Sequence, residues 1–324
     1  MFINSTVILF YTNMLFGVML SLSSNNWVMV WVGLEVSMVS FIPLMISNLM
    51  ISSECAMKYF ITQSMSSSIF ILGVIFMLMG VNINYEMIIV LSMAMKMGVA
   101  PFHTWVLSMV EGMNYTTMFN MFTIMSIVPM MIITMMNLNL NLVIMLTLIV
   151  GAIFGLNQNS IRKVLAYSSV FNMGFMMYSL KNLSLWIMYF LLYSLNLFML
   201  TKILSLNNIN YLNQLLVNKV ELKSKLSIWI LMLSSGGMPP MMGFMGKLIV
   251  IESSINFNDW MITISMIITS LLTMFYYNRL CFTIMSISSL MTKWKINNIS
   301  WLSMNVMIIN LTTMPFIMLL KYLA

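Results

Sequence analysis

The chain has 324 residues, of which 61% are hydrophobic and 6% are charged, and its formal net charge is +7. Soluble domains carry roughly 25% charged residues, so 14 basic and 7 acidic side chains cannot cover a water-soluble fold of this size. Because the basic residues stand in loops between apolar runs, the positive charge indicates membrane orientation rather than nucleic-acid binding.

Apolar stretches follow one another along the whole chain and are separated by short polar turns. A helix needs about 20 apolar residues to cross a bilayer, so the sequence predicts an all-α, polytopic membrane helix bundle of about eleven transmembrane helices. We predict a single transmembrane domain over residues 1–324, with no soluble domain. The expected spans are residues 3–22, 26–47, 55–80, 86–110, 115–136, 140–157, 161–180, 183–206, 226–250, 259–286 and 300–321.

Two of these stretches contain residues that break helices. Gly98 and Pro101 interrupt the fourth, and Gly236-Gly237-Met238-Pro239-Pro240 interrupts the ninth. Proline has no N–H to donate, so carbonyls one turn earlier lose their partner and must find another inside the bilayer. Discontinuous helices indicate an ion path in a transporter. A simple proline kink is the alternative at each position.

Three ionisable residues lie well inside predicted spans: Glu35, Lys96 and Lys247. A charge at the bilayer centre costs about 2.5–3.5 kcal/mol on insertion scales, so it persists only with a partner, with water or with a function. Glu35 and Lys96 form the natural acid–base pair on neighbouring spans. The pattern favours proton handling, and a static buried ion pair is the alternative.

Other candidate residues lie nearer the span ends or alone. Lys58 is a further relay candidate, although a snorkelling, interfacial role suits its position better. His103, the single histidine, is either a proton carrier or a satisfied polar group in the broken segment. Cys55 and Cys281 have no metal-ligand spacing, and we predict no metal site. The sequence shows no phosphate-binding glycine loop or nucleophile triad.

Six sequence blocks, in order, resemble the NADH dehydrogenase subunit 2 family of mitochondrial respiratory complex I. The resemblance covers roughly residues 24–280 and is closest to the animal form, which has eleven helices. The blocks are WVGLE at 31–35, SECAMKYF at 53–60, KMGVAPFHTW at 96–105, GLNQ at 155–158, RKVLAYSS at 162–169 and GGMPPMMGF at 236–244.

The resemblance implies an antiporter-like fold with two discontinuous helices and a role in proton translocation coupled to NADH oxidation elsewhere in the complex. It implies that Glu35 and Lys96 are a coupled pair and that Lys247 belongs to the second broken helix. It implies no cofactor in this chain, because FMN, iron–sulfur clusters and ubiquinone belong to partner subunits. The expected partners are neighbouring antiporter-like and small membrane subunits and lipids, including cardiolipin, in the mitochondrial inner membrane.

The chain departs from the family pattern at two positions. A family lysine corresponds to Ser126, and a family histidine corresponds to Asn172. A serine cannot carry a proton but can hold a water chain, so we hypothesise a water-filled gap at Ser126. The candidates for its walls are Asn120, Thr123, Tyr167 and Asn172.

Two other functions remain open at this point. A cation/proton antiporter subunit would share the same fold. A structural membrane-arm subunit with a decayed proton path would explain Ser126 and Asn172.

The orientation of the chain follows from the charges of its loops, since basic loops remain on the side from which membrane proteins insert. We predict that the N-terminus and the basic loop 207–225 face the matrix and that the C-terminus faces the intermembrane space. Labelling of the loop from the intermembrane side would contradict this orientation. The basic residues assigned to the matrix side are Lys58, Arg162, Lys163, Lys219, Lys223, Lys225, Lys293 and Lys295.

Overall fold

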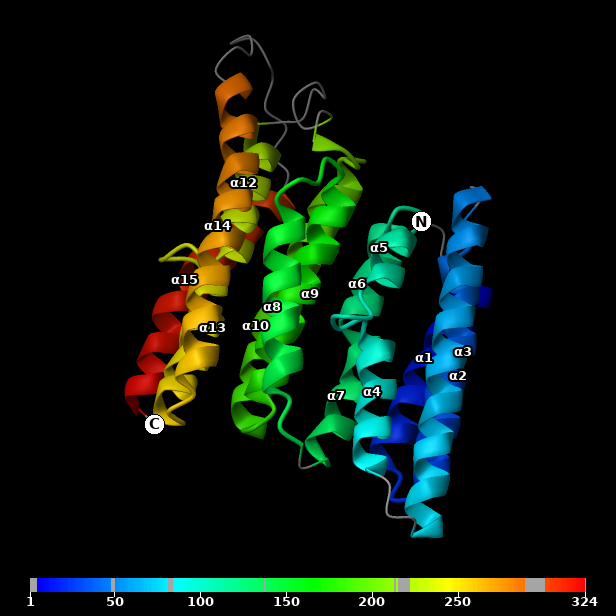
Figure 1. Cartoon of the computed structure of the whole chain (residues 1–324). Coiled ribbons are helices and arrows are strands. Elements are labelled where there is room, and N and C mark those ends of the chain that lie inside the picture. The colour runs from blue at the N-terminus through cyan, green and yellow to red at the C-terminus, as the bar shows by residue number, and fades with distance from the viewer. Residues whose placement is uncertain are drawn as a thin grey trace. The chain divides into compact units, whose positions relative to one another are not determined.

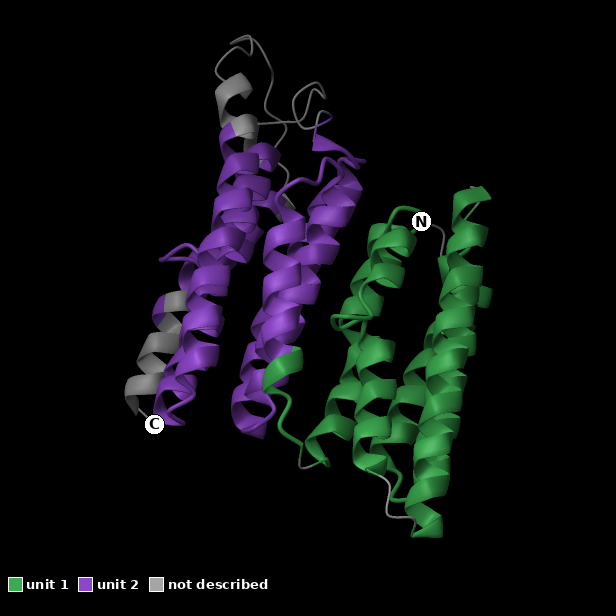
Figure 2. Cartoon of the chain, in the orientation of Figure 1, with its two compact units in different colours: residues 1–143 green, residues 144–324 purple. Residues whose placement is uncertain are grey.

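The structure, a computed structural model, is a set of helices that form two compact units (Figures 1 and 2). Unit 1 comprises residues 1–143 and unit 2 comprises residues 144–324. Within the predicted loop 207–225, residues 213 and 215–221, including Lys219, lie outside the described residues, as do Lys293 and Lys295. The structure describes residues 5–47, 50–80, 84–136, 138–212, 214, 222–288 and 301–323.

Unit 1 is held together by close helix contacts. A Cβ atom at Gly17 would lie 2.8 Å from the Gly33 carbonyl oxygen, and one at Gly33 would lie 2.8 Å from Ser21. Small residues allow this approach of backbones, which drives helix association in lipid. The helices are α1 (Ser5–Ser23), α2 (Trp27–Met45), α3 (Met50–Met79), α4 (Tyr85–Met97), α5 (Thr104–Val110), α6 (Tyr115–Phe122) and α7 (Ile124–Thr134).

In unit 2, α9 is buried along residues 164–179. A Cβ atom at Gly151 of α8 would lie 2.6 Å from the backbone nitrogen of Phe171, so α8 and α9 touch through their backbones. The helices, with α8 crossing the boundary between the units, are α8 (Asn141–Gly155), α9 (Ile161–Ser179), α10 (Leu183–Leu206), α12 (Leu222–Gly236), α13 (Met242–Asn256), α14 (Trp260–Ser288) and α15 (Trp301–Leu323).

Both predicted helix breaks are confirmed. Helix α4 ends at Met97, and Gly98 adopts a left-handed conformation with φ 70° that closes its last turn. Helix α12 ends at Gly236, Gly237 has φ 87°, and α13 begins at Met242. Glycine adopts positive φ without steric cost, which explains why these two positions end their helices.

A third discontinuity lies between α6 and α7, and the sequence did not indicate it. Thr123 separates the two helices with φ −114° and ψ −72°. No glycine or proline stands at this position. Pro129 follows inside α7, where it leaves a further carbonyl without its usual partner. The discontinuity therefore lies three residues before Ser126.

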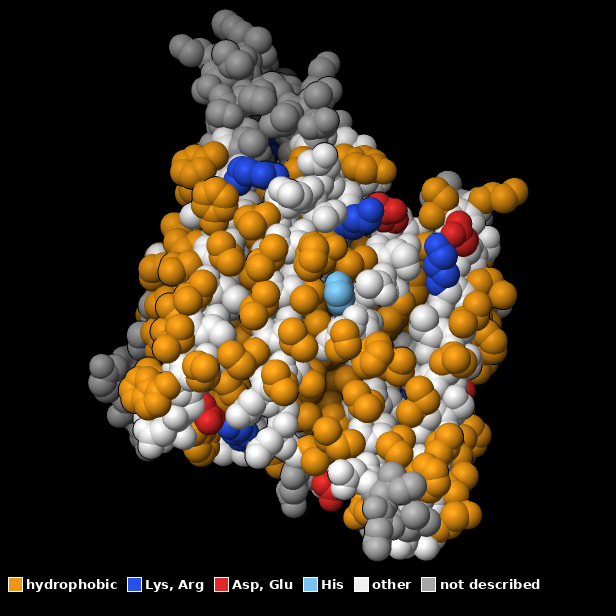
Figure 3. Space-filling model, viewed as in Figure 1, with side chains coloured by type: hydrophobic (Ala, Val, Ile, Leu, Met, Phe, Trp, Pro, Cys, Tyr) orange, Lys and Arg blue, Asp and Glu red, His pale blue; other side chains and the backbone are white. Residues whose placement is uncertain are grey.

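The surface is suited to lipid. Large hydrophobic side chains such as Phe16, Met19, Ile268 and Phe275 are exposed, and hydrophobic side chains cover most of the face shown in Figure 3. Among the described residues, six helices are long and apolar enough to cross a membrane. The chain is thus a polytopic helical membrane protein. Its total of about eleven spans stays a prediction.

An ion pair in unit 2 ties two turns together. The Asp259 carboxylate, between α13 and α14, accepts hydrogen bonds from Lys181 Nζ at 2.5 Å and from the Tyr178 hydroxyl at 2.8 Å. Lys181 also lies over the Tyr178 ring, 4.5 Å from its centroid. The hydrogen bond from Lys181 is the main reason that the pKa of Asp259 is below its usual value. The cluster fastens the end of α9 to the start of α14.

We expect this cluster to make the turn between α13 and α14 acid-sensitive. A depressed carboxyl pKa adds stability above the unfolded-state pKa of about 3.9, and that stability is lost as pH falls through the folded-state pKa. Hydrogen-exchange protection of residues 256–260 should therefore persist near neutral pH and fall in acid. Asp259→Asn should lower the protection at neutral pH, whereas Glu86→Gln in unit 1 should not. Equal protection in Asp259→Asn and the wild-type chain would show that the cluster contributes nothing.

Candidate functional site

Lys96 lies at the end of α4, beside a small internal cavity of unit 1. Lys96 is buried, with only 9% of the residue exposed. The cavity holds about 30 Å³, and a water molecule needs about 10–15 Å³ measured with a water-sized probe. It therefore has room for water beside a buried amine. Its lining residues are Leu34, Ser37, Met38, Tyr59, Gln63, Lys96, Met97, Trp105, Met121, Phe122, Met125, Ser126 and Pro129.

Glu35 approaches the same region from α2. Its Oε1 atom is buried and has no hydrogen-bond partner among the described residues. The carboxylate is close enough to act electrostatically on Tyr59 and Lys96. No direct ion pair joins Glu35 and Lys96 in the described part of the chain. Glu35 and Lys96, the predicted acid–base pair, thus lie in the same unit, and their charged groups are not in direct contact.

The carbonyls freed at the end of α4 are bound by side chains from other segments. Gln63 Nε2 donates to the Lys96 carbonyl at 3.2 Å, and Trp105 Nε1 donates to the Met95 carbonyl at 3.1 Å. Gln63 is 5% exposed and also lines the cavity. Sequence reasoning missed both residues, although a glutamine in the middle of an apolar span was a visible signal.

Ser126 lines the Lys96 cavity, but its hydroxyl is already engaged. It donates to the carbonyls of Thr123 at 2.8 Å and Phe122 at 3.1 Å, across the discontinuity between α6 and α7. Four methionines, Met38, Met97, Met121 and Met125, share the cavity wall. The cavity wall at Ser126 therefore contains both polar and apolar side chains, and the water-filled gap at this position stays a prediction.

The other residues expected near Ser126 are distributed differently. Asn120 Nδ2 donates to the Tyr11 hydroxyl at 3.1 Å, and the Thr123 hydroxyl donates to the Phe119 carbonyl. Neither lines the cavity. Tyr167 and Asn172 belong to unit 2.

Lys247 lies in the second turn of α13 and closes the break in unit 2. Its residue is 5% exposed, and Nζ donates to the Gly236 carbonyl at 2.8 Å and the Ser235 carbonyl at 3.2 Å. Nζ also lies 3.4 Å from the Thr273 hydroxyl and 5.1 Å from the centroid of the Phe171 ring. These carbonyls form the negative end of α12. The lysine thus lies beside the freed carbonyls, where the sequence predicted it.

Gly237 allows this arrangement. A Cβ atom there would lie 3.1 Å from both Cδ and Nζ of Lys247, and the residue has φ 87°. A larger residue would strain the backbone and press on the lysine. Gly237 thus both forms the turn after α12 and leaves room for the Lys247 amine to lie close to the backbone.

A cavity of about 40 Å³ extends from Lys247 between α9, α10 and α12. Tyr189 donates to Asn172 Oδ1 at 2.9 Å, and the Ser234 hydroxyl donates to Asn196 Oδ1 at 2.6 Å. Tyr167 does not line the cavity and instead stacks on Phe154. The lining residues are Leu165, Ser168, Asn172, Tyr189, Leu192, Tyr193, Asn196, Leu197, Leu200, Ser234, Ser235, Gly243, Gly246, Lys247 and Tyr277.

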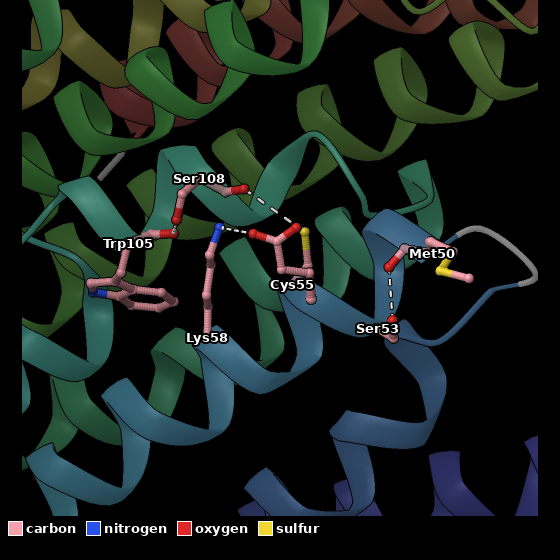
Figure 4. Close-up of polar contacts among 7 residues, drawn as sticks. Met50, Ser53, Cys55, Lys58, Trp105 and Ser108 are labelled. Atoms are coloured by element: carbon pink, nitrogen blue, oxygen red, sulfur yellow. Dashed lines mark hydrogen bonds and ion pairs between the residues drawn. The ribbon is translucent and has the colours of Figure 1, made fainter.

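Two further candidates lie away from both cavities. Lys58 forms an ion pair at 2.5 Å with Glu54, four residues earlier, and both side chains are largely exposed (Figure 4). On the same part of α3, the Cys55 thiol donates to the Ser108 carbonyl at 3.8 Å. His103 stands at the start of α5, with Nδ1 3.2 Å from the Pro101 carbonyl. The structure does not bring Lys58 or His103 to the cavity beside Lys96.

Broken helices beside buried lysines define an ion-translocating membrane subunit of the antiporter type. The family described as NADH:quinone oxidoreductase/Mrp antiporter, TM matches residues 24–273, and the chain belongs to this family. It is 34% identical to NADH-ubiquinone oxidoreductase chain 2 of Anopheles gambiae, over 90% of this chain and 89% of that protein. It is 36% identical to the protein of the same name from Locusta migratoria, over 87% of this chain and 86% of that protein.

Solved structures show the same fold. A chain of respiratory complex I from Thermus thermophilus has a TM-score of 0.81 at 20% identity, covering 94% of this chain and 75% of that chain. A chain of the Mrp complex from Dietzia sp. has a TM-score of 0.75 at 16% identity, covering 84% and 59%. The antiporter-like fold predicted from the sequence is confirmed.

Removing the Gln63 amide should loosen the break in α4. Gln63→Leu leaves the Lys96 carbonyl buried without its donor, which costs about 1–3 kcal/mol. Hydrogen-exchange protection of the amides of residues 94–98 should fall in the membrane-embedded protein. The control is Gln158→Leu, because Gln158 belongs to unit 2 and its half-buried side chain donates to the Phe154 carbonyl at the end of α8. Unchanged protection in Gln63→Leu would show that Gln63 does not hold the break.

Proposed function

We propose that this chain is a core membrane-arm subunit of a proton-translocating NADH:ubiquinone oxidoreductase of the mitochondrial inner membrane. Its family and its animal relatives support this assignment. The observation that supports proton transfer is that each unit contains a buried lysine beside a broken helix and a cavity with polar side chains in its wall.

In unit 1, the proposed carriers are Glu35 and Lys96. The two groups interact electrostatically without a direct ion pair, so a water molecule between them can pass a proton. A lysine amine balanced between burial and a nearby carboxylate changes protonation when its partner or its hydration changes. The Lys96 cavity, with Gln63 and Ser126 in its wall, supplies a place for that water.

In unit 2, Lys247 is the proposed carrier. Its charged form is supported by helix-end carbonyls and the face of Phe171, and cations bind favourably to both. No acidic side chain lines its cavity. Neutral amides and hydroxyls, including those of Asn172 and Asn196, can orient water there but cannot store a proton. Among the described residues that line this cavity, Lys247 is the one basic side chain and is therefore the proposed site of proton storage.

The chain supplies a proton path, and partner subunits supply the redox chemistry. FMN, iron–sulfur clusters and ubiquinone sites are assigned to those subunits. The proposed neighbours are other antiporter-like and small membrane subunits, together with lipids such as cardiolipin. The N-terminus is assigned to the matrix side and the C-terminus to the intermembrane side, from the loop charges.

A cation/proton antiporter subunit is the second candidate, because the fold is shared with a chain of the Mrp complex. The two functions are separable by experiment. Copurification with NADH:ubiquinone activity supports the first, and sodium–proton exchange in vesicles without that activity supports the second. If the chain were a structural subunit with a decayed path, replacing Lys96 or Lys247 in the assembled complex would leave proton pumping unchanged.

Replacing Glu35 by Gln should impair proton pumping in the assembled complex. The substitution keeps the shape and removes the charge that acts on Lys96. We expect at least a tenfold loss, equivalent to about 1.4 kcal/mol, in the rate of proton uptake coupled to NADH oxidation in closed vesicles. Glu54→Gln is the matched control, because Glu54 is exposed and pairs with Lys58. Normal pumping in Glu35→Gln would remove Glu35 from the path.

A further inference from the structure

Helix α13, which carries Lys247, begins inside unit 2 without a capping side chain of its own. Its preceding residue, Met241, makes no side-chain cap hydrogen bond. The backbone N–H of Met242 instead donates to Oδ1 of Asn310 at 3.2 Å. Asn310 lies on α15, 68 residues later in the chain, and is fully buried. An N-cap acceptor is thus supplied by a distant helix.

The break that holds Lys247 is therefore closed from both directions. On the α12 side, Lys247 Nζ binds the last carbonyls of the helix. On the α13 side, Asn310 binds the first N–H of the helix. Helix α15 packs on both α12 and α13. The position of the lysine thus depends on contacts made at each end of the gap.

The first turn of α13 sets where Lys247 points. Lys247 follows Met242 by five residues, which places it about 7.5 Å farther along the helix axis and fixes its direction around that axis. A slip of one residue at the start of α13 would turn the lysine by about 100°. Such a turn would remove Nζ from the Gly236 carbonyl, so the cap at Met242 controls the register of the amine.

The other end of the Asn310 amide adds a second observation. Its Nδ2 atom is buried and has no hydrogen-bond partner among the described residues. A buried donor without a partner costs about 1–3 kcal/mol. An apolar side chain of similar size would avoid this cost, so packing alone gives no reason for an amide here. The amide oxygen, Oδ1, is the atom of Asn310 that makes a hydrogen bond, which it accepts from the Met242 N–H.

We propose that Asn310 is a positioning residue for Lys247. Its Oδ1 fixes the start of α13 and thereby keeps Nζ against the carbonyls that support the charged amine. This inference rests on the proposed role of Lys247 in proton transfer. It assigns a part in that transfer to α15, a helix that lies beyond the matched family region.

The test compares Asn310→Leu with Asn310→Asp in the assembled complex in closed vesicles. Leu has a similar size and no acceptor, whereas Asp keeps the acceptor oxygen. In Asn310→Leu we expect pumping at high pH to fall by roughly fivefold, the factor equivalent to the ~1 kcal/mol typical of a lost N-cap, because the displaced amine keeps its proton less well. The high-pH limb of the pumping profile should move to lower pH. Asn310→Asp, which keeps the acceptor for the Met242 N–H, should pump better at high pH than Asn310→Leu.

Two further variants make the test decisive. Thr312→Val is the control on α15, because the exposed Thr312 hydroxyl donates only to carbonyls of its own helix, and its profile should match the wild type. Asn310→Ser replaces the leucine variant if that variant does not assemble, since a serine oxygen is too short to reach Met242. A wild-type pH profile in Asn310→Leu, or in Asn310→Ser, would overturn the proposal.

Lys247→Gln separates this inference from the proposed function. If Lys247→Gln stops pumping while Asn310→Leu keeps the wild-type profile, only the positioning role of Asn310 fails. If Lys247→Gln pumps normally, the proposed function of Lys247 fails, and the inference fails with it.

Discussion

A helix that breaks inside a bilayer leaves carbonyl and N–H groups that lipid cannot bind, and each one needs a partner from the protein or from water. The breaks after Met97 and Gly236 impose this requirement on both units. The partners are buried polar side chains that would otherwise be too costly to keep in an apolar environment. The same requirement thus accounts for the polar side chains in the walls of the two cavities that Lys96 and Lys247 line.

The two breaks meet the requirement in opposite ways. In unit 1 the lysine precedes the break, its carbonyl is bound by Gln63, and the residue lines the cavity. In unit 2 the lysine follows the break, and its amine binds the freed carbonyls itself. Lys96 is therefore supported by a side-chain carboxylate, that of Glu35, whereas Lys247 is supported by helix-end carbonyls. Proton transfer at these two positions should respond to different structural changes.

The local features of the sequence predicted the breaks and the burial of the two lysines, because glycine, proline and charge inside an apolar run act where they stand. Gln63 and Asn310 escaped prediction because their partners lie 33 and 68 residues away. The discontinuity at Thr123 escaped because no local helix breaker marks it. The partner of Lys58, by contrast, lies close to it in the sequence. Glu54 stands four residues earlier on the same helix, a spacing that favours an exposed ion pair.

Ordered water in the two cavities, seen in a high-resolution electron-density or cryo-EM map of the intact complex, is the most direct test of proton transfer through these breaks. The proposal predicts at least one water bound to the Lys96 amine beside Gln63 and Ser126, and another between Lys247 and Asn196. Cavities filled by the surrounding methionine and leucine side chains, with no water at either lysine, would contradict it.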